Sequence, residues 1–252
     1  MRRKIMLDFA IQTKGLTRMF GDFTAVDHIT FNVKQGEIFG FLGANGAGKT
    51  TAMKMLTGLL TPTSGEARVS GRDVYTEAES IKKNIGYMSQ KFSLYDDLTA
   101  EENIRFYGGV YGIQPHELSQ KAEELLERTG LIEERKKLVK DLPLGWKQKL
   151  AFSIAILHHP NIVFLDEPTG GVDPVTRRQF WEQIYEVSEQ GITVFVTTHY
   201  MDEAEYCDRI SIMVDGRMDA LGTPAELKQE HSAETIEEVF IKLARSAKRG
   251  GG

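Results

Sequence analysis

A short glycine-rich segment has the residue types and the spacing of a phosphate-binding loop. It consists of Gly43, Ala44, Asn45, Gly46, Ala47, Gly48, Lys49, Thr50 and Thr51, within which the run from Gly43 to Thr50 matches the pattern G-x-x-x-x-G-K-[ST]. Glycines let backbone N–H groups converge on phosphate oxygens, and a following helix adds the positive end of its dipole. Lys49 can then reach the β- and γ-phosphates, and the Thr50 hydroxyl can ligate Mg²⁺. The segment therefore predicts binding of a nucleoside triphosphate.

A carboxylate pair, Asp166 and Glu167, directly follows the apolar run Ile162–Leu165. Ligands of open α/β sheets bind at the carboxyl ends of the strands, where such a pair would lie beside the glycine-rich loop. We expect Asp166 to hold Mg²⁺, directly or through water, and Glu167 to polarise the attacking water. Taken alone, the pair is as often a turn signal as a site, and it is the loop upstream that favours the catalytic interpretation.

The elements that must position these groups follow from the hydrophobic pattern. The run Glu37–Leu42 predicts a strand that delivers the glycine-rich loop, and Lys49–Leu59 predicts the helix that follows it. The apolar runs Ile162–Leu165 and Ile192–Val196, separated by the helical pattern Arg177–Glu189, predict parallel strands with a crossover helix. Strand, loop and helix in this order are typical of an α/β nucleotide-binding core.

Two further regions surround this core. The first forty residues alternate apolar and polar positions around turn residues, which predicts a small antiparallel β region. From Thr99 to His159 the period becomes helical, which predicts a helical insert. We therefore expect an α/β P-loop NTPase core with an N-terminal antiparallel β subdomain and an inserted α-helical subdomain. The expected boundaries are 1–90 for the β region and first half of the core, 91–160 for the helical subdomain, 161–225 for the second half of the core, and 226–252 for a C-terminal helix and flexible tail.

Composition narrows the classes of function. The chain has 252 residues, and its 31 Lys and Arg against 36 Asp and Glu give a net charge of −5. Without an overall positive charge, no nucleic-acid partner is expected. The single Cys207 cannot form an internal disulfide, which favours a reducing, cytoplasmic location. No apolar run reaches the roughly 20 residues that span a bilayer, so we expect no membrane-crossing segment.

The order of these motifs resembles the nucleotide-binding domain of ABC transporters. Glycine-rich loop, glutamine loop, helical insert, Asp-Glu strand and a strand-terminal His follow one another over nearly the whole chain. The resemblance implies that Gln90 contacts Mg²⁺ and forms a hinge that meets a membrane partner. It also implies that His199 contacts the γ-phosphate and orients Glu167. The expected catalytic residues are thus Lys49, Glu167 and His199, and the expected Mg²⁺ ligands are Thr50, Gln90 and Asp166.

The resemblance assigns three more positions to nucleotide binding. Phe20 lies where the family places an aromatic that stacks on adenine, usually Tyr, and a phenyl ring offers the same π face. Packing in the core is the alternative for this residue. Asp173, in Gly170-Gly171-Val172-Asp173, occupies the D-loop, which is expected at a dimer interface. Gly145 is the retained glycine of the signature segment.

That signature segment departs from the family pattern. ABC domains act as head-to-tail dimers in which each ATP lies between one P-loop and the partner's signature, typically L-S-G-G-Q. The matching run here is Leu142–Trp146, in which Pro143 offers neither a hydroxyl nor an N–H and Leu144 adds a side chain where glycine lets the backbone approach. Donors in the run Lys147–Lys149 could replace the lost contacts. A weakened signature predicts a heterodimer and a compensated one a symmetric dimer, and both remain open.

The resemblance extends to a type of function. The stretches Thr197–Glu205 and Leu221–Leu227 are similar to those of drug-resistance ABC ATPases, whose membrane part is a separate polypeptide. This implies an ATPase with ATP and Mg²⁺ as cofactors, peripheral on the cytoplasmic face of the membrane, that energises export of drugs or other hydrophobic compounds. The implied partners are transmembrane permease subunits and a second ATP-binding domain. A soluble ABC ATPase acting on ribosomes or DNA, a nucleotide-gated regulator, and import in place of export are the alternatives.

Overall fold

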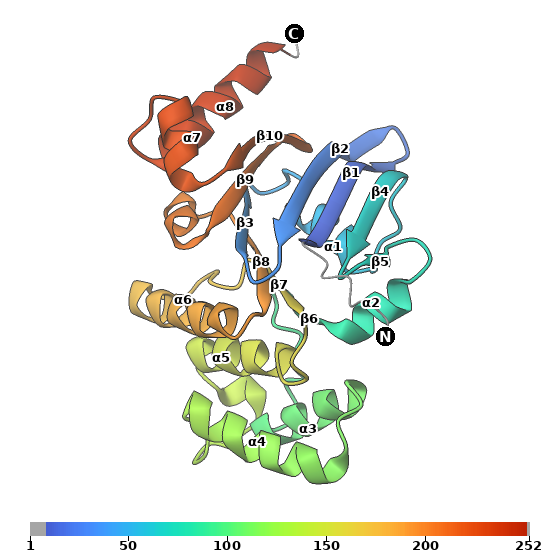
Figure 1. Cartoon of the computed structure of the whole chain (residues 1–252). Helices are drawn as coiled ribbons and strands as arrows, with labels where there is room; N and C mark the ends of the chain where they lie inside the picture. The colour runs from blue at the N-terminus through green and yellow to red at the C-terminus, as the bar shows by residue number, and fades with distance from the viewer. Residues whose placement is uncertain (1–8, 251–252) are drawn as a thin grey trace.

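The computed structural model describes residues 9–250, whose strands form two sheets (Figure 1). The larger sheet has six strands in the order β10-β9-β3-β8-β7-β6 and is parallel except for the hairpin β9–β10. Its strands are β3 (Ile38–Gly43), β6 (Ile85–Met88), β7 (Ile162–Asp166), β8 (Thr193–Thr198), β9 (Arg209–Val214) and β10 (Arg217–Gly222). The predicted parallel pairing of the two apolar runs around the crossover helix is confirmed as β7 beside β8.

The central strands are continuous apolar runs because both faces of the sheet are covered. Every residue of β3, β7 and β8 is buried. The register pairs Leu42 of β3 with Thr198 of β8, and Thr197 of β8 with Asp166 of β7. The carboxyl ends of these strands therefore meet at one edge of the sheet, where the glycine-rich loop follows β3.

The smaller sheet is antiparallel, in the order β2-β1-β4-β5, and covers one face of the core sheet. Its strands are β1 (Phe9–Phe20), β2 (Phe23–Lys34), β4 (Ser64–Val69) and β5 (Arg72–Asp73). Between the sheets lie helix α1 (Lys49–Leu56) and a cluster of phenylalanines, in which Phe31 stacks on Phe39 at 5.5 Å. Helix α1 ends before the predicted Leu59, because Gly58 at φ 71° turns the chain out of the helix.

Helices α5 (Leu144–Ala155) and α6 (Pro174–Glu189) cover the other face of the core sheet, together with the C-terminal helices α7 (Pro224–Glu230) and α8 (Ile236–Gly250). The predicted helices near the C-terminus are thus present. The flexible tail expected at the end of 226–252 is instead a continuation of α8 as far as Gly250, while Gly251 and Gly252 lie outside the described residues.

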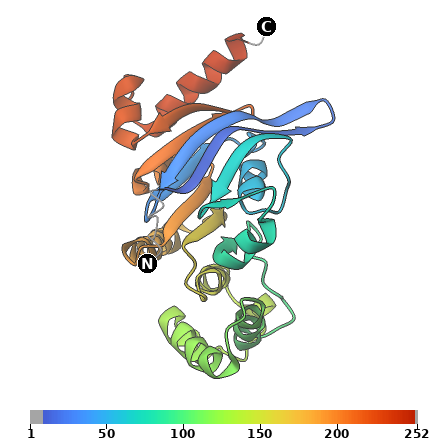
Figure 2. The same cartoon turned by 45° about the vertical axis from the view of Figure 1, so that its right-hand side comes forward.

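The predicted helical insert forms a layer at the opposite end of the molecule from α7 and α8, as both views show (Figures 1 and 2). It contains α3 (Ala100–Val110), α4 (Pro115–Thr129) and the short helix η1 (Val139–Asp141), and it shares α5 with the core. A capping box between Thr99 and Glu102 starts α3. Among the described residues, no helix is long and apolar enough to cross a membrane. Two further short helices are α2 (Ala78–Asn84), which connects β5 of the smaller sheet to β6 of the core sheet, and η2 (Met201–Tyr206), which connects β8 to β9.

Candidate nucleotide-binding site

The glycine-rich loop lies between β3 and α1, as its sequence predicts, and two of its glycines are required by close packing. A Cβ at Gly48 would lie 2.4 Å from the carbonyl oxygen of Ala25, and Gly48 has φ 100°. A Cβ at Gly43 would lie 2.6 Å from the carbonyl oxygen of Met213. Both contacts are shorter than real side chains tolerate, so the loop can follow this path only with glycine at these positions.

Lys49, the first residue of α1, places its ammonium group inside this loop. The side chain is 4% exposed, and Nζ donates to the carbonyl oxygens of Gly43 (2.8 Å) and Ala44 (3.1 Å). Nζ also lies 3.3 Å from Oε1 of Glu167. Burial lowers the pKa of Lys49, and the charges of Glu167 and Asp166 oppose that shift. The Lys49 ammonium is thus buried beside carboxylates, at the place where the phosphates of a nucleotide would follow the loop.

Asp166 ends β7 with its carboxylate directed at the start of α1. It is 4% exposed, and Oδ1 accepts hydrogen bonds from the hydroxyls of Thr197 (2.7 Å) and Thr50 (3.2 Å). Two of the expected Mg²⁺ ligands, Asp166 and Thr50, therefore lie side by side. The contact of Thr197 was not predicted from the sequence, where this residue is one of three threonines in the strand that precedes His199.

Glu167 is the point on which the other predicted residues converge. Its Oε2 accepts from Nε2 of Gln90 at 3.0 Å and lies 3.1 Å from Nδ1 of His199. Its backbone has φ 48°, a left-handed conformation that is uncommon and costly for a residue with a side chain. The amide is held there by Thr197, through the carbonyl oxygen at 3.1 Å and the hydroxyl at 3.0 Å.

An open groove runs from the loop to a pair of phenylalanines at the β1–β2 turn. Phe20 is 47% exposed, and the guanidinium of Arg18 lies 4.5 Å from its ring centre. Phe23, which pairs with Phe20 across the turn, is 66% exposed and was not anticipated. The groove is lined by Phe20, Phe23, Ala25, Asn45, Gly46, Gly48, Lys49, Thr50, Thr51, Gln90 and Glu167. An exposed aromatic above a cationic loop suits a base and its phosphates.

Two predicted residues, Gly145 and Asp173, do not line this groove but lie beside one another at the starts of α5 and α6. A Cβ at Gly145 would lie 2.9 Å from Cγ2 of Thr176. The hydroxyl of the same threonine donates to Asp173 at 2.6 Å, and Asp173 caps α6. Both residues thus lie outside the groove of their own chain. The resemblance implies such a position, because it assigns them to contacts with the nucleotide of a partner domain.

The start of α5 offers little to replace the missing signature contacts. Pro143 is the N-cap residue and makes no side-chain capping bond, and Leu144 is 44% exposed. The expectation that Gln148 could serve as a replacement donor is wrong, because its side chain is fully buried and donates to the carbonyl oxygen of Pro168 at 2.8 Å. Lys147 and Lys149 are also engaged within the chain, with Lys140 and Gln179 respectively.

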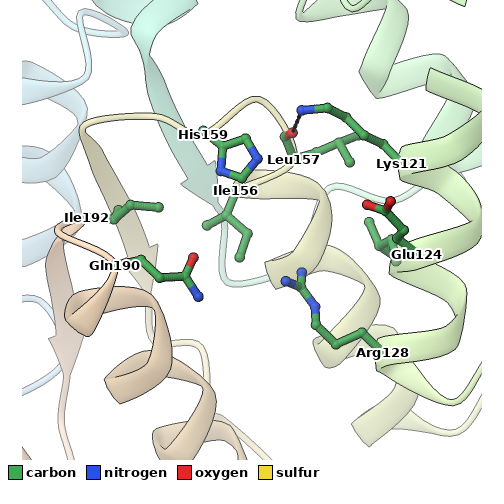
Figure 3. A pocket seen from close by; sticks show the side chains of 9 residues that line it. Lys121, Glu124, Arg128, Ile156, Leu157, His159, Gln190 and Ile192 are labelled. Carbon is green, nitrogen blue, oxygen red and sulfur yellow. Dashed lines mark hydrogen bonds between the residues drawn. The ribbon is translucent and has the colours of Figure 1, made fainter. Parts of the chain in front are cut away.

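A second groove lies at the other end of the core sheet (Figure 3). Lys121 reaches across it from α4 and donates to the carbonyl oxygen of Leu157 at 3.3 Å. Ile192, which lines it, directly precedes β8, and His159, which also lines it, lies three residues before the first residue of β7. The groove is therefore remote from the carboxyl ends of the strands, and we assign it no part in nucleotide binding.

A protein-family model described as "ABC transporter" matches residues 26–170, which include the loop, Gln90 and the Asp166–Glu167 pair. The chain belongs to the ABC transporter family. It is 50% identical over 238 residues to "Probable multidrug ABC transporter ATP-binding protein YbhF" of Escherichia coli (strain K12), a match that covers 92% of this chain and 41% of that protein. The chain thus spans less than half the length of this ABC relative.

A second ABC relative is matched over more of its length. "Linearmycin resistance ATP-binding protein LnrL" of Bacillus subtilis (strain 168) is 38% identical over 232 residues, which are 92% of this chain and 75% of that protein. Both relatives are named as ATP-binding proteins, which agrees with the chemistry of the groove.

Solved structures confirm the ABC ATPase fold. One described as "Structure of ATP binding subunit of ABC transporter" superposes with a TM-score of 0.84 at 27% identity, covering 93% of this chain and 99% of that one. A dimeric post-hydrolysis state of the ATP-binding cassette MJ0796, bound to ADP and Pi, superposes with a TM-score of 0.77 at 26% identity. The match covers 84% of this chain and 98% of that one. The core, antiparallel sheet and helical insert of this ABC protein are therefore those of the ATP-binding cassettes.

Proposed function

We propose that this chain hydrolyses ATP as the nucleotide-binding subunit or domain of a membrane exporter. The observation that supports this most strongly is the position of the Glu167 carboxylate, which lies within 3.3 Å of Lys49 and bonds Gln90 and His199 beside the loop. Phosphoryl transfer depends on positioned charge and one acceptor aimed at the nucleophile. The export direction rests on relatives that are named for multidrug transport and linearmycin resistance.

In this proposal each residue acts through its own contacts. Lys49, which bonds loop carbonyls and approaches Glu167, would exchange these partners for the β- and γ-phosphates. Glu167 would then be free to accept a hydrogen bond from the attacking water. His199, whose Nδ1 lies 3.1 Å from Oε2 of Glu167, would hold that carboxylate in place and approach the γ-phosphate. Phe20 would stack on the adenine ring.

Thr50, Gln90 and Asp166 would hold Mg²⁺. The hydroxyl of Thr50 and the carboxylate of Asp166 already share a hydrogen bond of 3.2 Å, so two oxygen donors of the kind that Mg²⁺ prefers converge here. Gln90 donates through Nε2 to Glu167 and retains its amide oxygen as a ligand. When bound, the ion would neutralise charge on the β- and γ-phosphates.

Two ATP-binding domains would act together, with Gly145 and Asp173 facing the partner's nucleotide. A related cassette is dimeric in a state bound to ADP and Pi. The partner would be a second copy or a different ATP-binding domain, and transmembrane permease subunits would meet the region around Gln90 on the cytoplasmic face. We retain 1–90, 91–160, 161–225 and 226–252 as the proposed domain limits, and the separate apolar core of α3, α4 and α5 favours the second of them.

The proposal is tested by the ATPase rate of the purified chain. We expect release of phosphate from ATP that requires Mg²⁺ and stops when EDTA removes it. Light scattering of a Glu167→Gln variant, with and without ATP and Mg²⁺, then measures the association that the dimer model requires. A chain that binds ATP but releases no phosphate, alone or mixed with a second ATP-binding domain, would contradict the proposed ATPase function.

A further inference from the structure

A buried carboxylate outside the groove is the strongest feature that the proposed function does not use. Glu203 lies in η2, after His199, and its side chain is fully buried. The hydroxyl of Thr169 donates to its Oε1 at 2.5 Å. Burial raises the pKa of Glu203, and Thr169 and Arg177 oppose the shift. An apolar residue would fill the same space without the cost of desolvating a carboxylate, so the contacts of Glu203 need an explanation.

These contacts connect the two segments that flank the Glu167 carboxylate. On one side, Thr169 is two residues beyond Glu167 and is itself 1% exposed. On the other side, Nε of Arg177 lies 3.7 Å from the same Oε1 of Glu203, and the guanidinium of Arg177 lies 4.1 Å from the ring centre of Tyr200. That ring is 4.2 Å from the ring of His199. Glu203 thus links Thr169 to His199 through a continuous set of contacts.

The segment that Thr169 belongs to is held from a third direction. Gln148 of α5 donates to the carbonyl oxygen of Pro168 at 2.8 Å. Glu167, directly before Pro168, keeps a left-handed backbone at φ 48°. A conformation of this kind persists only where the surroundings hold it, and the bonds of Gln148 and Glu203 hold the two residues that follow it.

We propose that Glu203 is a positioning residue, which through Thr169 and Arg177 fixes the turn after Glu167 and the His199 segment relative to one another. This inference rests on the proposed ATPase function, because it concerns the geometry of the hydrolytic step. Glu203 and Thr169 do not line the groove, so loss of their hydrogen bond should change turnover and leave nucleotide binding intact.

The experiment compares Thr169→Val, Thr169→Ser and Glu203→Gln with the parent for kcat, ATP affinity and melting temperature. Valine has the shape of threonine without the hydroxyl, and serine keeps it. We expect kcat to fall about tenfold in Thr169→Val, which loses the hydrogen bond, and in Glu203→Gln, which loses the negative charge beside Arg177, with ATP affinity within about twofold of the parent. Thr169→Ser should recover most of the lost kcat.

Thr193→Val is the matched control. Thr193 is also fully buried, and its hydroxyl accepts a hydrogen bond from the amide of Gly36 at 3.0 Å, but it begins β8 at the end of the sheet away from the loop. It should lose stability without losing kcat. The inference is overturned if Thr169→Val and Glu203→Gln keep the parent kcat while their melting temperatures fall like that of Thr193→Val. Absence of turnover in the parent would instead remove the proposed function, and this inference with it.

Discussion

The loop half of the nucleotide site and the start of α5 present different chemistry to ATP. In the loop half, charged groups are buried and paired, with Lys49 and Glu167 3.3 Å apart and 4% and 9% exposed. At the start of α5, Pro143 makes no side-chain capping bond and Leu144 is 44% exposed. Under the proposed function, the first region would act on a triphosphate with groups of its own chain. The second would offer a partner's nucleotide an apolar surface and few donors.

Under the proposed function, this chain would supply every group that hydrolyses the ATP bound to its own loop, but an altered signature to the ATP bound by its partner. The buried Gln148 sharpens this contrast, because this potential donor near the altered signature is already bonded to the carbonyl oxygen of Pro168. The two functions of the chain can therefore be separated by substitution.

The largest effect should come from Lys49→Ala. Loss of a buried ammonium that bonds phosphates removes charge-assisted hydrogen bonds, so ATP affinity should fall about 100-fold. Equilibrium dialysis with labelled ATP measures it. Lys54→Ala is the matched control, since Lys54 lies on the same helix but is exposed. Similar affinities in the two variants would mean that Lys49 does not hold phosphate.

A smaller effect is expected from restoring the signature with Pro143→Ser and Leu144→Gly together. A hydroxyl and an N–H at this point would regain a hydrogen bond to a charged phosphate, which is worth about 1.5–3 kcal/mol. Turnover of the chain alone should rise about tenfold at low protein concentration. Val110→Ser, an equally polar change at a residue that is 63% exposed on α3, serves as the control. Unchanged or lower turnover in the double variant would show that the natural segment is fully functional.

The smallest effect concerns the helical insert that carries the altered segment. Glu101 on α3 accepts from Arg105 and Arg135 at 2.9 Å each, and these two arginines lower its pKa to about 2. Since the folded pKa lies below the ordinary carboxyl value, the bonds stabilise the insert at neutral pH and are lost as pH falls from about 4.5 toward 2.

Glu101→Gln should therefore lower the free energy of unfolding by about 1 kcal/mol at pH 7, after allowance for solvent screening. Urea unfolding at a series of decreasing pH values measures this difference in the free energy of unfolding between variant and parent. The difference should shrink as the pH falls from about 4.5 toward 2. A gap that stays constant between pH 7 and pH 3 would mean that the charge of Glu101 does not contribute. ATP affinity should be the same in both proteins, because Glu101 lies outside the groove.

The sequence was sufficient to predict the core strands and the places of Lys49 and Asp166 in the fold, and the reason is local. Strands β3, β7 and β8 are buried on both faces, so each is a continuous apolar run that can be recognised without knowing its neighbours. Lys49 and Asp166 then follow from their places at the ends of such runs. The left-handed backbone of Glu167 could not be anticipated, because it depends on bonds from β8.

Three contacts between distant segments were not predicted from the sequence. Thr197 reaches Asp166 only because the register of β7 and β8 sets them side by side. The sequence places Gln148 among the donors of the first turn of α5, but the packing of α5 on the core directs its side chain inward. Glu203 lies in a charged stretch that gives no sign of burial. In each case the partner lies 20 or more positions away in the sequence, and Gln148 and Pro168 are 20 positions apart.

The central claim, that this chain carries a complete hydrolysing half-site with Glu167 as its acceptor, is tested most directly by the nucleotide bound to Glu167→Gln. The variant and the parent are incubated with ATP and Mg²⁺, separated from free nucleotide, and the bound nucleotide is identified by chromatography. The account predicts ATP on Glu167→Gln and ADP on the parent, with affinities for ATP within about twofold. ADP on both proteins, formed at equal rates, would contradict it.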